Sequence, residues 1–183
     1  GSGTLIAGID IAGAGGTINI GAAEGSAAAP AGEILAGKID LFASASKLVF
    51  NHTAMGYGLA ADITGAGSLR QVAGITVLTG NNDYSGETQL IGGRLIAGSW
   101  SGFSPNSDYT VASSAVLEVA GGFGTVAAVG SLSGAGFVRI GDEETLVVGT
   151  TNRTATFSGT FLGNGSLEFV GTGSQIYTGT GTL

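Results

Sequence analysis

The sequence predicts an all-β fold of the solenoid type, and three features of the chain carry this prediction. Short β-branched and aromatic runs recur along the whole chain, a glycine-centred motif returns three times, and helix signals are nearly absent. Glycine supplies 36 of the 183 residues, well above the usual roughly 7 %, so the backbone turns often or approaches itself closely. Hydrophobic residues make up 43 % of the chain, which is enough to form a core and argues against disorder.

The strand signals are short runs between clusters of Gly, Asn, Ser and Thr, and many of them alternate apolar with polar residues. This alternation is the pattern of a strand with one buried face. We expect strands at residues 47–50, 75–78, 88–91, 94–97, 116–119, 137–140, 145–148 and 166–170. The alanine-rich stretch 22–31 has no helical stripe and is interrupted by Gly25 and Pro30, so we expect a loop there.

The glycine-centred motif occupies residues 63–69, 132–138 and 161–167, and each copy leads into a strand. Its first glycines, Gly65, Gly134 and Gly163, lie 69 and 29 residues apart, and solenoids tolerate such variable insertions. A single coil of roughly 20 to 30 residues cannot bury its apolar residues alone, so it must stack on its neighbours. The chain is long enough for roughly six to nine coils and a rod about 30 to 45 Å long.

Residues 77–95 closely resemble the passenger-associated transport repeat of Gram-negative type V autotransporters. The residues that carry the resemblance are Gly80, Asn81, Tyr84, Ser85, Gly86 and Thr88. Glu87 stands where the family usually has a second glycine. The resemblance implies a right-handed parallel β-helix (β-solenoid) in which these six residues form a structural repeat motif. It also implies that 1–183 is a single segment of a larger passenger, with less typical coils at 1–62 and transport-repeat-like coils at 63–183.

The same resemblance implies a structural and adhesive role in cell-surface adhesion or aggregation, together with assistance to passenger folding and secretion. The implied location is extracellular, at the bacterial cell surface, after export across the outer membrane. The implied partners are a host or bacterial surface protein or glycan, and an outer-membrane β-barrel translocator covalently linked in the full-length protein. Open strand edges at the end coils make self-association a further expectation.

The sequence offers little support for catalysis or for cofactor and metal binding. Cysteine is absent, which excludes thiol chemistry, and His52 is the single histidine, which we expect to be solvated. Asp83 is expected to bond backbone groups at a corner, and the acidic cluster 142–144 is expected to be a solvated turn. A net charge of −7 with only six Lys and Arg argues against nucleic acid. We therefore expect no enzyme, no cofactor and no metal.

An alternative function is a β-helical polysaccharide-active enzyme or its accessory domain. Thirteen acidic residues are enough to place two carboxylates about 5 to 10 Å apart in a groove, as glycosidases require. A flat face of Ser, Thr and Asn without a cleft would favour the adhesive role instead.

Three aromatic residues, Trp100, Phe103 and Tyr109, lie close together within 98–110, a segment expected to project as a loop. Exposed aromatic rings can stack on sugars or pack into a protein partner, so we predict a partner-binding loop here. The alternative is that one or two of the rings fold back to cap the apolar column.

Overall fold

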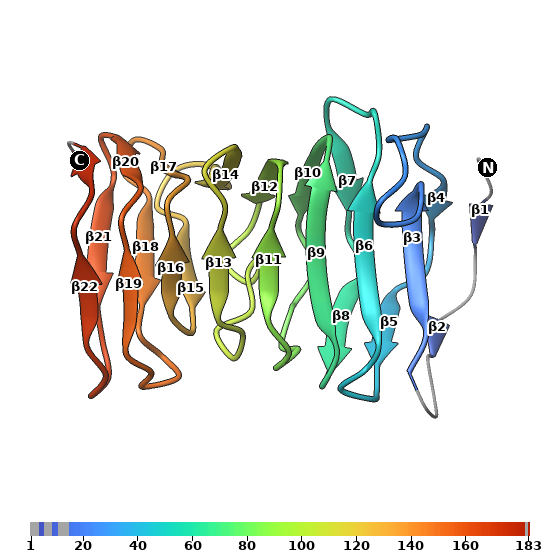
Figure 1. Cartoon of the computed structure of the whole chain (residues 1–183), viewed down its shortest axis with the longest axis horizontal. Helices are drawn as coiled ribbons and strands as arrows, with labels where there is room; N and C mark the ends of the chain where they lie inside the picture. Colours follow the sequence, from blue (N-terminus) through green and yellow to red (C-terminus); the bar gives the residue numbers. More distant parts are fainter. Residues whose placement is uncertain (1–3, 6–8, 11–14, 182) are drawn as a thin grey trace.

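The computed structural model describes residues 4–5, 9–10, 15–181 and 183 (Figure 1). Residues 1–3, 6–8 and 11–14, part of the coils expected at 1–62, lie outside the described residues, and so does residue 182 of the coils expected at 63–183. In the described chain, strand follows strand without a helix, and every strand pair is parallel. The strands stack into coils that advance from the N-terminal to the C-terminal end (Figure 1). This arrangement confirms the predicted parallel β-solenoid.

Two long sheets form two faces of the solenoid. The first consists of β3 (Thr17–Gly21), β6 (Lys47–Asn51), β9 (Ser68–Ala73), β11 (Thr88–Leu90), β13 (Tyr109–Val111), β16 (Leu132–Gly134), β19 (Ala155–Phe157) and β22 (Gln175–Tyr177). The second consists of β7 (Tyr57–Leu59), β10 (Ile75–Leu78), β12 (Gly93–Ala97), β14 (Ala115–Val119), β17 (Phe137–Ile140), β20 (Thr160–Gly163) and β23 (Thr180–Gly181). Eight strands at about 4.8 Å spacing make the first sheet about 34 Å long.

The third face is interrupted. Its N-terminal part consists of β2 (Ile9–Asp10), β5 (Lys38–Leu41) and β8 (Asp62–Gly65), and its C-terminal part of β15 (Val126–Val129), β18 (Thr145–Val148) and β21 (Ser166–Phe169). Between them, two coils run as irregular segments at 79–87 and 98–108. A separate short pair joins β1 (Thr4–Leu5) to β4 (Glu33–Ile34).

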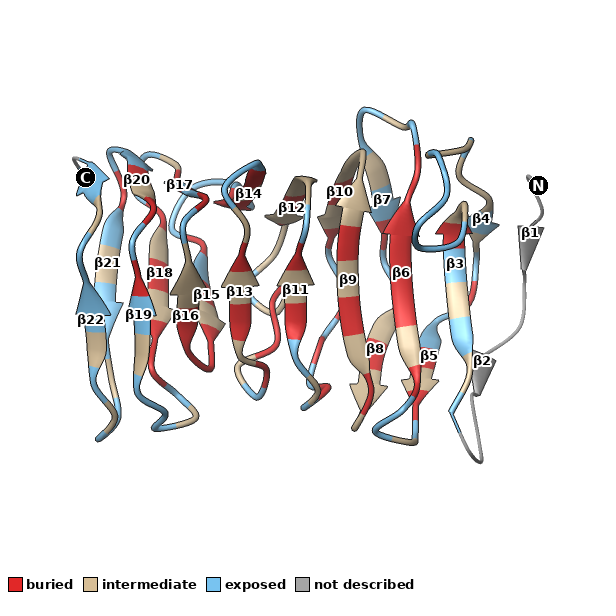
Figure 2. Ribbon diagram, viewed as in Figure 1, coloured by how far each residue is buried: buried red, intermediate tan, exposed pale blue. Residues whose placement is uncertain are grey.

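The register places like residues above one another in the core. Paired positions lie 19 residues apart between Leu69 and Thr88 and 30 apart between Thr17 and Lys47, close to the predicted coil length. Buried positions alternate with less buried ones along strands such as β9, β10 and β18 (Figure 2). Leu, Ile, Val and Phe side chains from successive coils form one continuous buried cluster, because a single coil has too few neighbours to exclude water.

The first glycine of each copy of the glycine-centred motif is required by its backbone conformation and by its close contact with the preceding coil. Gly65, Gly134 and Gly163 all have positive φ, at 97°, 106° and 114°, a region that side-chain-bearing residues rarely adopt. A Cβ at Gly134 would lie 2.1 Å from the carbonyl oxygen of Val111, one coil below. The motif therefore recurs because each copy makes the same close turn against the preceding coil.

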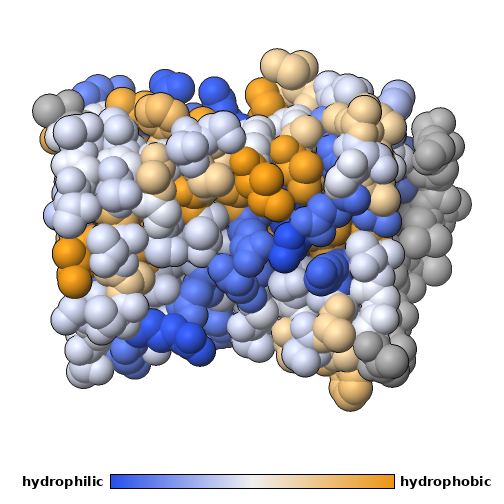
Figure 3. All heavy atoms as spheres, viewed as in Figure 1, coloured by the Kyte–Doolittle hydropathy of each residue, from blue (hydrophilic) through white to orange (hydrophobic). Residues whose placement is uncertain are grey.

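The outer surface of the first sheet carries a band of polar side chains, which crosses this face in Figure 3. Arg70, Gln89, Thr110 and Ser133 occupy matching positions on successive strands. Thr110 donates a hydrogen bond to the Glu87 carboxylate at 2.9 Å, and Gln89 donates to the same carboxylate at 2.6 Å. The band is thus a hydrogen-bonded ladder that follows the stacking of the coils.

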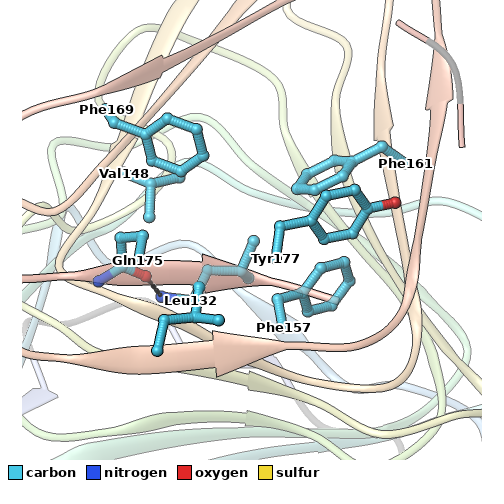
Figure 4. Close-up of a pocket in the computed structure, with 8 residues that line it drawn as sticks. Leu132, Val148, Phe157, Phe161, Phe169, Gln175 and Tyr177 are labelled. Atoms are coloured by element: carbon cyan, nitrogen blue, oxygen red, sulfur yellow. Dashed lines mark hydrogen bonds between the residues drawn. The ribbon is translucent and has the colours of Figure 1, made fainter. Parts of the chain in front are cut away.

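The C-terminal end of the column is open and aromatic. The rings of Phe157, Phe161 and Tyr177 pack with centroids 4.9 to 6.2 Å apart, and they line a pocket together with Leu132 and Val148 (Figure 4). Tyr177 and Phe169 keep 40 % and 55 % of their surface exposed. The inward-facing residues of the final coil therefore meet solvent.

Candidate functional site

The predicted aromatic loop separates into one exposed and two buried residues. Phe103 and Tyr109 are almost completely buried, whereas Trp100 keeps 67 % of its surface exposed. This is the alternative in which two of the rings fold back into the apolar column, and it leaves Trp100 as the exposed ring of the predicted partner-binding loop. Tyr109 lies on β13, where its pairing with Thr88 turns it inward. Phe103 packs against it with ring centroids 5.5 Å apart and fills the column in a coil that has no strand on the third face.

Asn82 holds the two irregular segments of the third face together. Its Oδ1 accepts a hydrogen bond from the backbone N–H of Ile63 at 2.9 Å, and its Nδ2 donates to the carbonyl of Gly102 at 2.7 Å. Its backbone N–H donates to Ser101 at 3.0 Å. One buried side chain thus bridges the coils before and after its own. This is the corner role expected of Asp83, whose own side chain is exposed.

An open hollow of about 290 Å³ lies where the third face is interrupted. We call it the Trp100 hollow; it is lined by Asn81, Asp83, Trp100, Ser101, Pro105 and Ala128, with Asn82 and Phe103 beneath. The side chains of Asn81 and Asp83 are exposed, and Asn106 fixes the backbone of Asp83 through a bond from Nδ2 to its carbonyl at 3.1 Å. An aromatic face, an amide and a carboxylate therefore share one concave surface.

The repeat-motif residues meet in a buried polar network beside this hollow. Ser107 Oγ donates to the Gly86 carbonyl at 2.7 Å, so it must accept from Thr88 Oγ1, also at 2.7 Å. Thr88 Oγ1 in turn lies 2.7 Å from the hydroxyl of Tyr84. Burial raises the pKa of both Tyr84 and Tyr109, and the neighbouring Tyr84 phenol raises that of Tyr109 further. Both phenols are therefore held as neutral hydrogen-bonding groups.

The remaining motif residues contact the preceding coil. A Cβ at Gly80 would lie 2.3 Å from the carbonyl oxygen of Ala61, and one at Gly86 would lie 2.2 Å from that of Gly67. The backbone N–H of Asn81 donates to the Asp62 carboxylate at 2.7 Å, and that of Ser85 to the Gly65 carbonyl at 2.9 Å. These contacts explain why the motif needs small residues at fixed positions.

His52 is buried, which corrects the expectation of a solvated side chain. Its Nε2 lies 2.9 Å from Thr76 Oγ1, and its ring packs near Tyr57 with centroids 5.4 Å apart. A Cβ at Gly74 would lie 2.2 Å from Nδ1, so the glycine makes room for the ring. Burial lowers the pKa of His52, which favours the neutral imidazole.

The acidic turn also differs in part from its prediction. Asp142 and Glu143 are exposed in the turn as expected, whereas Glu144 is buried. The Glu144 carboxylate accepts hydrogen bonds from the backbone N–H groups of Gly122 and Gly141 at 2.9 and 3.1 Å. It ties the turn to the preceding coil.

A second polar concavity, which we call the Glu87 groove, is lined by Ser85, Glu87, Asp108, Ser131, Ser133 and Arg153 and encloses about 480 Å³. Asp108 pairs with Arg153 at 3.0 Å and accepts from Thr151 Oγ1 at 2.7 Å. The Glu87 carboxylate accepts from Gln89 and Thr110. Both carboxylates are thus already engaged as hydrogen-bond acceptors.

Within the part of the chain that the structure describes, no three His, Asp or Glu side chains gather where they could share a metal ion. None of the described residues belongs to a helix of sufficient length and hydrophobicity to cross a membrane.

Two curated proteins are similar to parts of this chain. The "Adhesin BmaC autotransporter" of Brucella suis biovar 1 (strain 1330) is 39 % identical over 72 residues, which cover 39 % of this chain and 2 % of the adhesin. The "Uncharacterized lipoprotein YdeK" of Escherichia coli (strain K12) is 34 % identical over 139 residues, covering 68 % of this chain and 10 % of the lipoprotein. No family model and no solved structure matches. The chain therefore spans a tenth or less of the relatives it matches, and it resembles part of an autotransporter adhesin.

Proposed function

We propose that this chain is a structural and adhesive segment of an autotransporter passenger, which mediates cell-surface adhesion or aggregation and assists passenger folding and secretion. The observation that carries the proposal is the unbroken apolar column of a parallel solenoid, joined to the partial similarity to an autotransporter adhesin. A packed column makes a stiff rod, because each coil contacts only its neighbours and buries its apolar face on both. Such a rod holds binding surfaces at a distance from the cell.

The proposed location is the cell surface, after export across the outer membrane. The similar proteins carry the names of an autotransporter adhesin and a lipoprotein, which are both classes of cell-envelope protein. The absence of cysteine is consistent with export, because no disulfide can form and obstruct passage of an unfolded chain. The proposed partners are a host or bacterial surface protein or glycan, a covalently linked outer-membrane translocator in the full-length protein, and a second copy of the chain.

The direct test is binding of the purified chain to arrays of extracellular-matrix proteins and glycans, with a turnover assay on every glycan that is bound. We expect saturable binding without turnover. The urea-unfolded chain is the control, because adhesion by a solenoid surface requires the stacked coils. Absence of binding on both arrays, or equal binding by the unfolded chain, would contradict an adhesive role for this segment.

The alternative function is a polysaccharide-active enzyme, and the Glu87 groove is the feature that favours it. Glu87 and Asp108 lie in one concavity with hydroxyl groups that could hold a sugar. Against it, both carboxylates are engaged by neighbouring side chains, whereas a catalytic acid must reach the glycosidic oxygen. Repeated turnover that is lost in Glu87→Gln and Asp108→Asn, and kept in the exposed-turn control Glu143→Gln, would establish the enzyme instead.

A further inference from the structure

We propose that the Trp100 hollow is a binding site for a neutral saccharide, with the sugar ring stacked on the Trp100 indole. This inference rests on the proposed adhesive function and names the chemical class of ligand at one site. It differs from the predicted loop, because two of the three predicted aromatic residues are buried, and the exposed Asn81 and Asp83 line the hollow together with Trp100.

The first observation is that, of the three aromatic residues in the described segment 98–110, only Trp100 is exposed to solvent. Two aromatic residues from the same region, Phe103 and Tyr109, are almost completely buried, while Trp100 is 67 % exposed. Burying an indole is strongly favourable. The segment thus folds two rings into the core and leaves the largest one available for contact with a ligand.

The second observation is that the exposed ring sits on a fixed backbone. The N–H of Gly102 donates to the carbonyl of Ser99 at 3.2 Å and closes a turn around Trp100. Asn82 then anchors the same turn through the carbonyls of Ser101 and Gly102, at 3.0 and 2.7 Å. A fixed backbone leaves only the side chain of Trp100 to be ordered on binding, which lowers the entropic cost of binding at this site.

The third observation is the chemistry around the ring. A sugar ring has an apolar face of C–H groups and a rim of hydroxyls, so it needs an aromatic surface flanked by hydrogen-bonding groups. The Asp83 carboxylate is an acceptor, and the Asn81 amide is both donor and acceptor; both line the hollow with Trp100. The volume of about 290 Å³ is at the lower end of ligand pockets and fits one or two sugar units.

The charge around the hollow favours a neutral saccharide over an acidic one. No Lys or Arg is among the described residues that line the hollow, whereas Asp83 is. The whole chain also carries a net charge of −7. Sulfated or sialylated glycans would therefore meet repulsion and lack a cationic partner.

The test uses the fact that Trp100 is the single tryptophan of the chain, so its fluorescence reports on this site alone. The purified chain is titrated with lactose and with chitobiose up to about 10 mM, which is tenfold above a dissociation constant of about 1 mM. A heparin disaccharide is the acidic control. We expect a saturable change in Trp100 fluorescence with at least one neutral sugar and none with the heparin disaccharide.

Variants locate the site by calorimetric titration with the same sugars. Trp100→Ala and Asp83→Asn should each weaken binding at least tenfold. The control Phe123→Ala removes another exposed aromatic ring, 86 % exposed and outside the hollow, and should bind like the wild type. Equal urea midpoints establish that all variants are folded.

The results separate this inference from the proposed function. Glycan binding that Trp100→Ala leaves unchanged overturns the hollow as the site but leaves adhesion standing. If the chain binds only proteins on the arrays and its Trp100 fluorescence responds to neither neutral sugar, the inference is also overturned, while the proposed adhesive function stands. If Phe123→Ala loses as much sugar binding as Trp100→Ala, the sugars contact exposed aromatic rings non-specifically, and the inference is overturned as well.

Discussion

Replacing Gly86 by alanine should destabilise the solenoid through contact between adjacent coils rather than through backbone strain. Gly86 does not have positive φ, so alanine can adopt its conformation. The new Cβ, however, would lie 2.2 Å from the carbonyl oxygen of Gly67 and 2.4 Å from its carbon. An ordinary contact of 3.4 Å requires the coils to separate locally by about 1.2 Å, a quarter of the usual strand spacing of about 4.8 Å.

Such a separation would break ladder hydrogen bonds on either side. The bond from Ser85 N–H to Gly65 is 2.9 Å long, and that from Leu69 N–H to Glu87 is 3.1 Å. Two weakened bonds together with overpacking amount to a loss of about 2–4 kcal/mol. Urea unfolding followed by far-ultraviolet circular dichroism measures this loss as a lower midpoint.

Gly58→Ala is the matched control for this prediction. Gly58 also lacks positive φ, and nothing lies within 4 Å of its added Cβ. Alanine there should be neutral or stabilising by up to about 1 kcal/mol, because it restricts the unfolded chain. Equal midpoints for Gly86→Ala and Gly58→Ala would refute the close-stacking explanation of the motif glycine.

Three further predictions test the polar groups of the solenoid. Thr88→Val should cost about 1–3 kcal/mol in urea unfolding, because Tyr84 and Ser107 lose their shared partner, whereas Thr110→Val on the outer face should cost under about 1 kcal/mol; equal costs would count against the network. Between pH 6.5 and the lowered pKa of His52, the unfolded chain binds a proton that the folded chain does not. The free energy of unfolding should therefore fall with falling pH by up to about 1.4 kcal/mol per pH unit. If the urea midpoint of His52→Gln depends on pH in the same way as that of the wild type, this explanation is contradicted. The pair of the partly exposed Arg94 and the buried Glu118, 2.9 Å apart, should be worth about 1 kcal/mol in a double-mutant cycle at low salt, and a coupling that does not decrease at 1 M salt would disprove its electrostatic origin.

Many strands could be predicted from the sequence because the alternation of apolar and polar residues within a strand reflects which of its side chains are buried. All eight predicted runs coincide with strands; 75–78 and 137–140 match β10 and β17 at both ends. Other strands of the described residues, among them β3, β5, β9, β13 and β16, were not predicted as separate elements. In β9, for example, the polar Gln71 occupies an inward position, so local hydrophobicity does not mark this strand.

The candidate site was only partly visible in the sequence. Trp100 was found from its position among turn residues, and the motif residues around it were found through a family resemblance. The sequence did not predict that Trp100 and these residues line one hollow, because the hollow forms where the third face has irregular segments instead of strands in two successive coils. Asn82 carries the bridge between those coils, yet nothing in its own neighbourhood distinguishes it from Asn81.

The sequence by itself determined that this chain forms strands, turns at glycines and stacks into a solenoid, because alternation and turn residues act within a few positions of one another. Only the tertiary structure decided which side chains are enclosed. Phe103, Tyr109, His52 and Glu144 are all buried, although each lies in or beside a segment that locally resembles an exposed loop. The physical reason is that burial in a solenoid is set by residues about 20 positions away on the neighbouring coils, and their register is established only when the coils stack.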